Sequence, residues 1–107
     1  MTLKFSQLKP SQSVNSDLYV TPASKQSVIS TISMCNISSS TDYARVFITP
    51  SGNAYDQNAL YYDLEIVPSD TFLSTAGFTV PYGSKMVCYS ENGGISFGAF
   101  YDEGSVS

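Results

Sequence analysis

The sequence has no histidine and no tryptophan, and charged residues make up only 13% of its 107 residues. A typical globular chain carries about 25% charged residues. Without histidine, the chain lacks the commonest general base, the usual partner of a serine nucleophile and the commonest metal ligand. We therefore expect no catalytic, cofactor-binding or metal-binding residues, and we do not expect an enzyme.

Cysteine and basic side chains are also scarce. Cys35 and Cys88 are too few for a four-ligand zinc site. Because the first residues lack the apolar stretch of a secretion signal, we favour two thiols in or near the core over one disulfide. Net charge is −4, and the five basic residues are scattered along the chain: Lys4, Lys9, Lys25, Arg45 and Lys85. This distribution predicts no nucleic-acid partner.

No apolar run approaches the length of about 18 residues that a membrane-spanning helix needs, and no basic amphipathic segment is present. We expect no membrane partner. The chain is instead rich in hydroxyl side chains, with nineteen serines and eight threonines, and its hydrophobic fraction of 42% is normal for a folded protein.

Short β-branched and aromatic runs alternate with turn residues, and helical periodicity is missing. This pattern predicts an all-β domain, an antiparallel β-sandwich of seven or eight strands that is jelly-roll-like or immunoglobulin-like. We divide the chain into an N-terminal arm (1–17), one β-sandwich domain (18–103) and a C-terminal tail (104–107). A glycine in the middle of the last strand, Gly98, indicates a bulge or a close backbone approach.

Period-two alternation assigns strand faces. In residues 41–49, we expect Tyr43, Arg45 and Phe47 to face outward. In residues 59–67, the predicted inward set is Leu60, Tyr62, Leu64 and Ile66, and the outward set is Tyr61, Asp63 and Glu65. Asp63 and Glu65 are neighbouring carboxylates that could serve calcium binding or glycosidase chemistry. A solvated strand face is favoured, since nothing else on the chain converges on the pair.

Tyrosine offers a large contact area with a polar tip, so outward tyrosines favour a protein interface, although they also stack on sugars or cover the ends of a sandwich. The apolar residues of the arm alternate nearly enough to add a strand to a neighbouring subunit. The candidate interface residues are Leu3, Phe5, Leu8, Tyr19, Tyr43, Tyr61, Tyr82 and Tyr89.

Residues 18–36 read LYVTPASKQSVISTISMCN, and later elements follow at 43–48, 61–63, 69–71, 77–80 and 95–100. Over roughly residues 18–103, this order of turns and strands resembles small virion structural proteins of tailed bacteriophages, especially those of cyanobacteria. Two departures are Val20-Thr21-Pro22, where the family pattern has Val directly before Pro, and Gly83-Ser84-Lys85, where it has Gly-Asp.

The resemblance implies a non-enzymatic β-sandwich that is a structural part of the virion, which is assembled in the host cytoplasm. Its partners would be other virion proteins, of the capsid or of the neck and tail, and further copies of itself in a homo-oligomer. A capsid decoration (cement) protein and a neck or tail accessory protein both remain open. The alternative is a host-recognition or carbohydrate-binding module whose partner is a host surface glycan.

Overall fold

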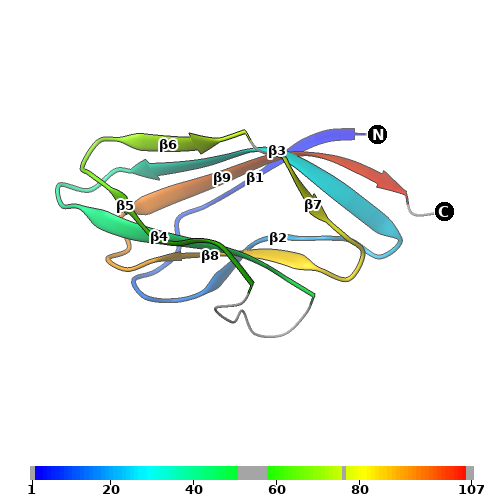
Figure 1. Cartoon of the computed structure of the whole chain (residues 1–107), viewed down its shortest axis with the longest axis horizontal. Coiled ribbons are helices and arrows are strands. Elements are labelled where there is room, and N and C mark those ends of the chain that lie inside the picture. Colours follow the sequence, from blue (N-terminus) through cyan, green and yellow to red (C-terminus); the bar gives the residue numbers. More distant parts are fainter. Residues whose placement is uncertain (1, 51–57, 76, 106–107) are drawn as a thin grey trace.

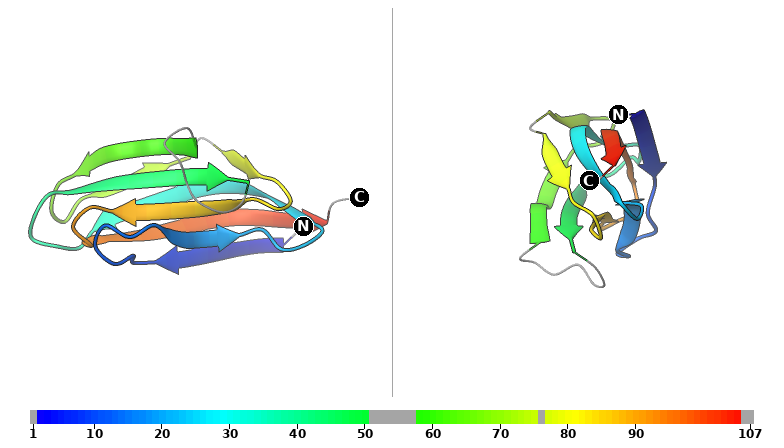
Figure 2. Two further views of the ribbon diagram at one scale, coloured as in Figure 1. Left: turned by 90° about the horizontal axis from the view of Figure 1, so that it is seen from below. Right: turned by 90° about the vertical axis from the view of Figure 1, so that its right-hand side faces the viewer.

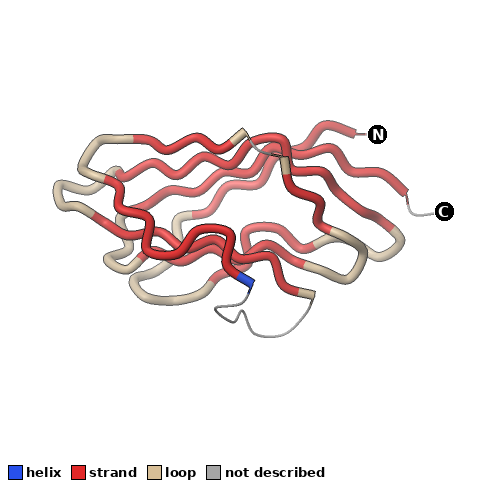
Figure 3. The backbone as a smooth tube through the Cα atoms, viewed as in Figure 1, coloured by secondary structure: helices blue, strands red, loops and turns tan. Residues whose placement is uncertain are grey.

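The computed structural model describes residues 2–50, 58–75 and 77–105, and nearly all of the regular structure in them is β (Figures 1 and 3). The strands are β1 (Thr2–Leu8), β2 (Ser16–Val20), β3 (Lys25–Asn36), β4 (Asp42–Thr49), β5 (Ala59–Ile66), β6 (Thr71–Ser74), β7 (Phe78–Val80), β8 (Lys85–Ser90) and β9 (Ile95–Ser105). The predicted all-β class is confirmed.

Two antiparallel sheets pack face to face (Figures 1 and 2). The five-stranded sheet has the order β1-β9-β3-β6, and β7 also pairs with β3. The four-stranded sheet has the order β2-β8-β4-β5. The molecule is therefore a β-sandwich, as the sequence predicts.

Strands near the two ends of the sequence pair with each other, and so do strands progressively nearer its middle. The first strand pairs with the last, β2 pairs with β8, β3 pairs with both β6 and β7, and β4 pairs with β5. A long hairpin rolled into two sheets gives this order, which is that of a jelly roll. The immunoglobulin-like alternative is wrong, because that fold has the strand orders ABED and CFG.

The N-terminal segment is part of the sandwich, and the predicted arm over 1–17 is wrong. β1 pairs with β9 in an unbroken register from Thr2 opposite Glu103 to Leu8 opposite Phe97. Leu8, the last residue of this strand, is partly buried and packs against the core. β9 runs to Ser105, so the predicted tail over 104–107 begins inside a strand, and the sandwich has nine strands instead of seven or eight.

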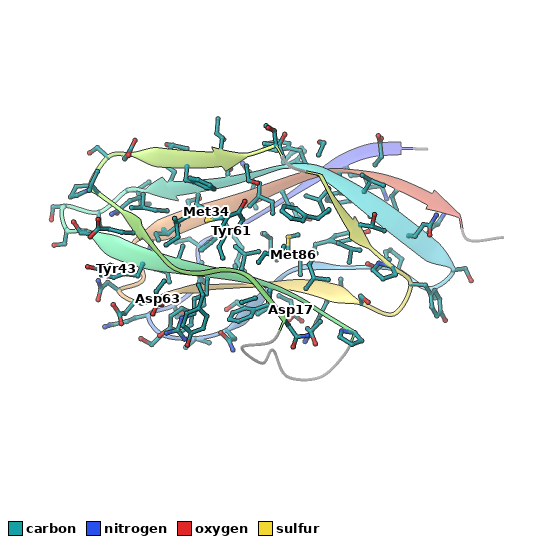
Figure 4. All side chains as sticks on the ribbon, viewed as in Figure 1. Asp17, Met34, Tyr43, Tyr61, Asp63 and Met86 are labelled. Atoms are coloured by element: carbon teal, nitrogen blue, oxygen red, sulfur yellow. The ribbon has the colours of Figure 1, made fainter. Side chains whose placement is uncertain are left out.

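The core lies between the two sheets. Its largest fully buried apolar side chains are Phe97, Ile29, Ile32, Met34, Met86, Ile95, Val46 and Val80. Figure 4 shows Met34 and Met86 in this layer, with Tyr61 beside them. Burial of apolar surface of this kind is the dominant favourable term in folding.

Strand β5 departs from the predicted alternation. Tyr61 packs against the core and Tyr62 is 46% exposed, which reverses the predicted orientation of both residues. The cause is a bulge, since Ala44 and Val46 of β4 pair with Leu64 and Tyr61, so that three residues of β4 span four of β5. An extra residue of this kind shifts which side chains point inward.

Strand β2 carries a second irregularity. Its register with β8 shifts between Asp17 and Tyr19, and both Leu18 and Tyr19 are buried. The prediction that Tyr19 faces outward is therefore wrong, because the irregularity lets two consecutive side chains enter the core.

Candidate functional site

Among the described residues, the buried carboxylates Asp42 and Glu103 are hydrogen-bonded within the fold. Within residues 2–50, 58–75 and 77–105, no three His, Cys, Asp or Glu side chains are grouped so that they could hold a metal ion. No helix in the same ranges is long and apolar enough to cross a membrane.

Asp42, at the start of β4, is a fully buried carboxylate. Its Oδ1 accepts hydrogen bonds from the backbone N–H groups of Tyr43 and Asn92, at 2.7 and 2.9 Å. Its Oδ2 accepts from the Ser90 hydroxyl at 2.7 Å and from the Gly94 N–H at 2.8 Å. Burial raises the pKa of Asp42, but these four donors outweigh it and hold the pKa below its ordinary value. The carboxylate fastens the loop after β8 to β4.

Glu103, near the end of β9, is a second buried carboxylate. The Tyr19 hydroxyl donates to its Oε2 at 2.6 Å, and the Lys4 ammonium group lies 2.9 Å from its Oε1. These bonds, the one from Tyr19 foremost, hold the pKa of Glu103 below its ordinary value. The hydroxyls of Tyr19 and Ser27 also hydrogen-bond to each other. This network joins β1, β2, β3 and β9 at one edge of the sandwich.

Both cysteines are free, as expected from the sequence. Cys35 is half-buried in the five-stranded sheet, whereas Cys88 is fully buried in the four-stranded sheet. Burial raises the pKa of the Cys88 thiol to about 12. Since the thiolate is the reactive form of cysteine, Cys88 is a poor nucleophile.

The outer surface of the four-stranded sheet, here called the four-stranded face, carries an aromatic cluster around Arg45. The guanidinium carbon lies 4.1 Å from the ring centre of Tyr62 and 4.5 Å from that of Tyr89. Arg45 also donates two hydrogen bonds to the carboxylate of Asp63, at 2.7 and 3.3 Å. The Asp63 carboxylate, which the sequence pairs with Glu65, thus has a cationic partner that the sequence alone does not identify.

The four-stranded face is also rich in charge. Lys85 and Asp17 form another ion pair at 3.0 Å, and Glu65 of β5 lies opposite Tyr43. Figure 4 shows Tyr43, Asp63 and Asp17 on this side of the sandwich. Alternating acidic and basic groups make a surface suited to polar partners.

The outer surface of β1, β9, β3, β6 and β7, here called the five-stranded face, is different in kind. Its exposed large apolar side chains are Phe5, Val28, Leu73 and Phe100. Between them lie hydroxyl and small side chains, including Ser30, Thr31, Ser33, Thr79 and Gly98. Two charged residues of the described strands reach this face: Asp102 faces outward opposite Val28, and Lys4, whose side chain is 46% exposed, lies at the β1 edge.

An open depression of about 270 Å³ lies on this face. It is lined by Lys4, Phe5, Ser30, Phe100 and Tyr101. The Phe5 and Phe100 rings lie 6.2 Å apart on neighbouring strands. An exposed aromatic pair on a surface with little charge has the composition of the central part of a protein interface.

The predicted interface residues do not form one site. Phe5 lies on the five-stranded face, Tyr43 and Tyr89 lie on the four-stranded face, and Tyr82 is 58% exposed in the turn after β7. Tyr19 is buried in the core, whereas Leu8 and Tyr61 are partly buried and pack against it. Leu3 pairs with Asp102 through the backbone, and its side chain lies outside the described part of the chain.

Other residues of both faces were missed. Phe100 alternates with buried Ala99 and Tyr101, so its outward position follows from the pattern of β9. Arg45 is correctly predicted to face outward, but its stacking on Tyr62 depends on the bulge in β5. Phe47 also faces outward yet is only 3% exposed, opposite Val87.

Comparison of the chain with protein-family models, with curated proteins and with solved structures finds no match in any of the three.

Proposed function

We propose that the chain is a non-enzymatic structural component of a tailed-bacteriophage virion, a capsid decoration or a neck or tail accessory protein that acts through protein–protein assembly. The observation that supports this most is the five-stranded face, where four large apolar side chains are exposed among hydroxyl groups. Phe5 and Phe100 of this set are neighbours, and exposed apolar surface that exceeds scattered single residues marks interaction sites. Jelly rolls recur in viral capsid proteins, a fold-level analogy that agrees with the proposal.

Mass spectrometry of purified particles of the phage that encodes the chain tests this proposal. We expect the chain at a constant ratio to the major capsid protein after the particles are washed at high salt. A capsid decoration gives far more copies per particle than a neck or tail component. Particles that lack the chain would overturn the proposal.

A pair of matched variants tests which face makes the contact. Val28→Asp places a charge on the five-stranded face, where Val28 is 44% exposed, and Tyr62→Asp does so on the four-stranded face, where Tyr62 is 46% exposed. We expect Val28→Asp to reduce the number of copies per particle and Tyr62→Asp to leave it unchanged, with circular dichroism confirming that both variants fold. The opposite result would move the contact to the four-stranded face.

A host-recognition or carbohydrate-binding module is the second candidate, and the Arg45 cluster favours it. Tyrosine rings beside a guanidinium and a carboxylate supply stacking and hydrogen-bonding groups for a glycan. However, the guanidinium already covers one side of both the Tyr62 and Tyr89 rings. We therefore place this function second.

A glycan array tests the second candidate. If it is correct, Tyr62→Ala abolishes binding, and Tyr82→Ala, which removes an exposed tyrosine from a distant turn, leaves it intact. No binding by the unaltered chain at high concentration would rule this function out.

A further inference from the structure

Strand β1 forms one edge of the five-stranded sheet, and in the part of the chain that the structure describes no strand pairs with its outer side. Its seven residues pair with β9 in a register without a shift. An edge strand that is regular and extended offers its free N–H and C=O groups to another strand.

The other edges of the sandwich are irregular or short. β2 has a register shift between Asp17 and Tyr19, and β5 has two shifts and a residue at φ 53°, Asp63. On the far side of the five-stranded sheet, β6 and β7 have only four and three residues. Bulges and short strands are the usual protection against edge pairing. β1 has neither.

The charges on β1 also favour a second copy of the same strand. Its sequence, TLKFSQL, contains one charged residue, Lys4, whose ammonium group is already paired with Glu103. Two β1 strands therefore meet without unpaired like charges, although each chain carries a net charge of −4. The edge at β5, in contrast, presents Asp63 and Glu65.

Phe5 is the middle residue of β1, and its side chain is 63% exposed on the five-stranded face. If two β1 strands pair in antiparallel fashion about their midpoints, the two Phe5 side chains lie directly opposite each other. Such cross-strand neighbours contact each other, and aromatic pairs are among the favourable ones. Phe100 of each copy, 6.2 Å from its own Phe5, extends the contact to four rings.

We propose that two copies of the chain associate by antiparallel pairing of their β1 strands about a two-fold axis at Phe5. The two five-stranded sheets then become one continuous sheet. A two-fold interface uses the same surface on both subunits, and a strand paired with itself meets this requirement. The inference deepens the proposed assembly function, on which its biological purpose rests, by identifying a partner as a second copy of this chain.

Sedimentation equilibrium of the purified chain over a range of concentrations tests the association. We expect a reversible dimer. Phe5→Lys places two like charges opposite each other at the axis and weakens the dimer at least about tenfold. The matched control is Leu73→Lys, because Leu73 is 61% exposed on the same face but lies on β6, at the opposite edge. This control leaves the dimer unchanged.

Crosslinking tests the register independently of stability. In a Cys35→Ser background, Phe5→Cys brings two thiols together at the axis, where directly opposed Cβ atoms are about 4.5–5.5 Å apart. That spacing is close to the range a disulfide accepts. Mild oxidation gives a covalent dimer of Phe5→Cys and none of Leu73→Cys.

A chain that stays monomeric up to about millimolar concentration, the weak end of specific affinities, overturns the inference. It is also overturned if the chain is monomeric and β1 pairs with a strand of a different protein. Equal weakening by Phe5→Lys and Leu73→Lys also overturns it, because the interface would then not be the β1 edge. The test of the dimer and the test of the virion proposal are independent. If the chain dimerises through β1 but is absent from virus particles, only the virion proposal is refuted. If the chain is monomeric but present in particles, only the dimer is refuted.

Discussion

Two tyrosine side chains connect the sheets across the core. The Tyr19 hydroxyl of β2 donates to Glu103 of β9, and the Tyr61 hydroxyl of β5 donates to Ser74 of β6 at 2.6 Å. In each case the ring adds to the apolar layer while the hydroxyl satisfies a polar group of the opposite sheet. Part of the tyrosine content of the chain therefore serves cohesion between the sheets instead of an interface.

Tyr19→Phe tests the stronger of these connections. The change removes a hydrogen bond to a carboxylate and leaves the fully buried Ser27 hydroxyl without this partner, so we expect the free energy of unfolding to fall by about 1–3 kcal/mol. Urea denaturation at neutral pH measures the loss. In the control Tyr82→Phe, the exposed side chain loses only its hydroxyl, and the change is within about 0.5 kcal/mol.

The same variant has a distinctive dependence on alkaline pH. Burial, followed by the hydrogen bond to Glu103, raises the pKa of Tyr19 from 10.0 to about 12. A raised pKa in the folded state means that the stabilisation is complete below pH 10.0 and is lost as the pH rises through about 12. The stability difference between the unaltered chain and Tyr19→Phe should therefore shrink in this range. A constant difference would contradict the assignment.

Asp42→Asn tests the other buried carboxylate. Each oxygen of the Asp42 carboxylate accepts two hydrogen bonds, and asparagine replaces one of these oxygens with an NH₂ donor. We therefore expect the free energy of unfolding to fall by about 2 kcal/mol at neutral pH. The folded-state pKa lies below the ordinary value of 3.8, so the carboxylate contributes its stabilisation above 3.8 and loses it as the pH falls through the folded-state pKa. Denaturation at acidic pH should then show a smaller difference between the two proteins. Glu103 titrates in both, so its contribution cancels.

At the scale of the strands, local patterns predicted the elements better than their irregularities. Alternation in β4 correctly placed Ala44 and Val46 inside and Arg45 outside. It failed in β5, because a bulge is fixed by the register with β4, which the local pattern of β5 does not record. In β1, near-alternating apolar residues predicted a strand added to a neighbouring subunit, but the strand pairs with β9 of its own chain, a distant partner that the local pattern does not reveal.

Gly98 lies next to a side chain of the neighbouring strand, and the bulge or close backbone approach predicted at this position is not found. A Cβ at this position would lie 2.7 Å from the Ser33 hydroxyl of the neighbouring strand, with the next nearest atoms at 3.9 Å. We expect Gly98→Ala to destabilise the fold by about 1–3 kcal/mol through overcrowding. Ser33→Ala removes the atom in the way, so Gly98→Ala should cost much less in that background. Thermal unfolding of the four proteins forms a double-mutant cycle, and strictly additive effects would refute the contact as the cause.

At the scale of the whole molecule, charge is distributed unevenly between the two faces. Asp17, Arg45, Asp63, Glu65 and Lys85 belong to the four-stranded face, whereas the five-stranded face is built from apolar and hydroxyl side chains. Hydroxyl side chains such as those of Thr31, Ser33 and Thr79 add neutral polar surface to the five-stranded face. The five-stranded face therefore carries fewer charged side chains than the four-stranded face.

This asymmetry predicts how dimerisation responds to salt. Pairing through β1 involves no ion pair between the two copies, because Lys4 is neutralised by Glu103 of its own chain. Raising the salt concentration from about 0.05 to about 0.5 M screens exposed charges and should leave the dimer unchanged or slightly stronger, since the net charge of −4 on each chain is also screened. Association through the ion pairs of the four-stranded face would weaken instead. Sedimentation equilibrium at the two salt concentrations separates these outcomes, and Arg45→Gln, which removes one of the cations of the four-stranded face, should change neither measurement.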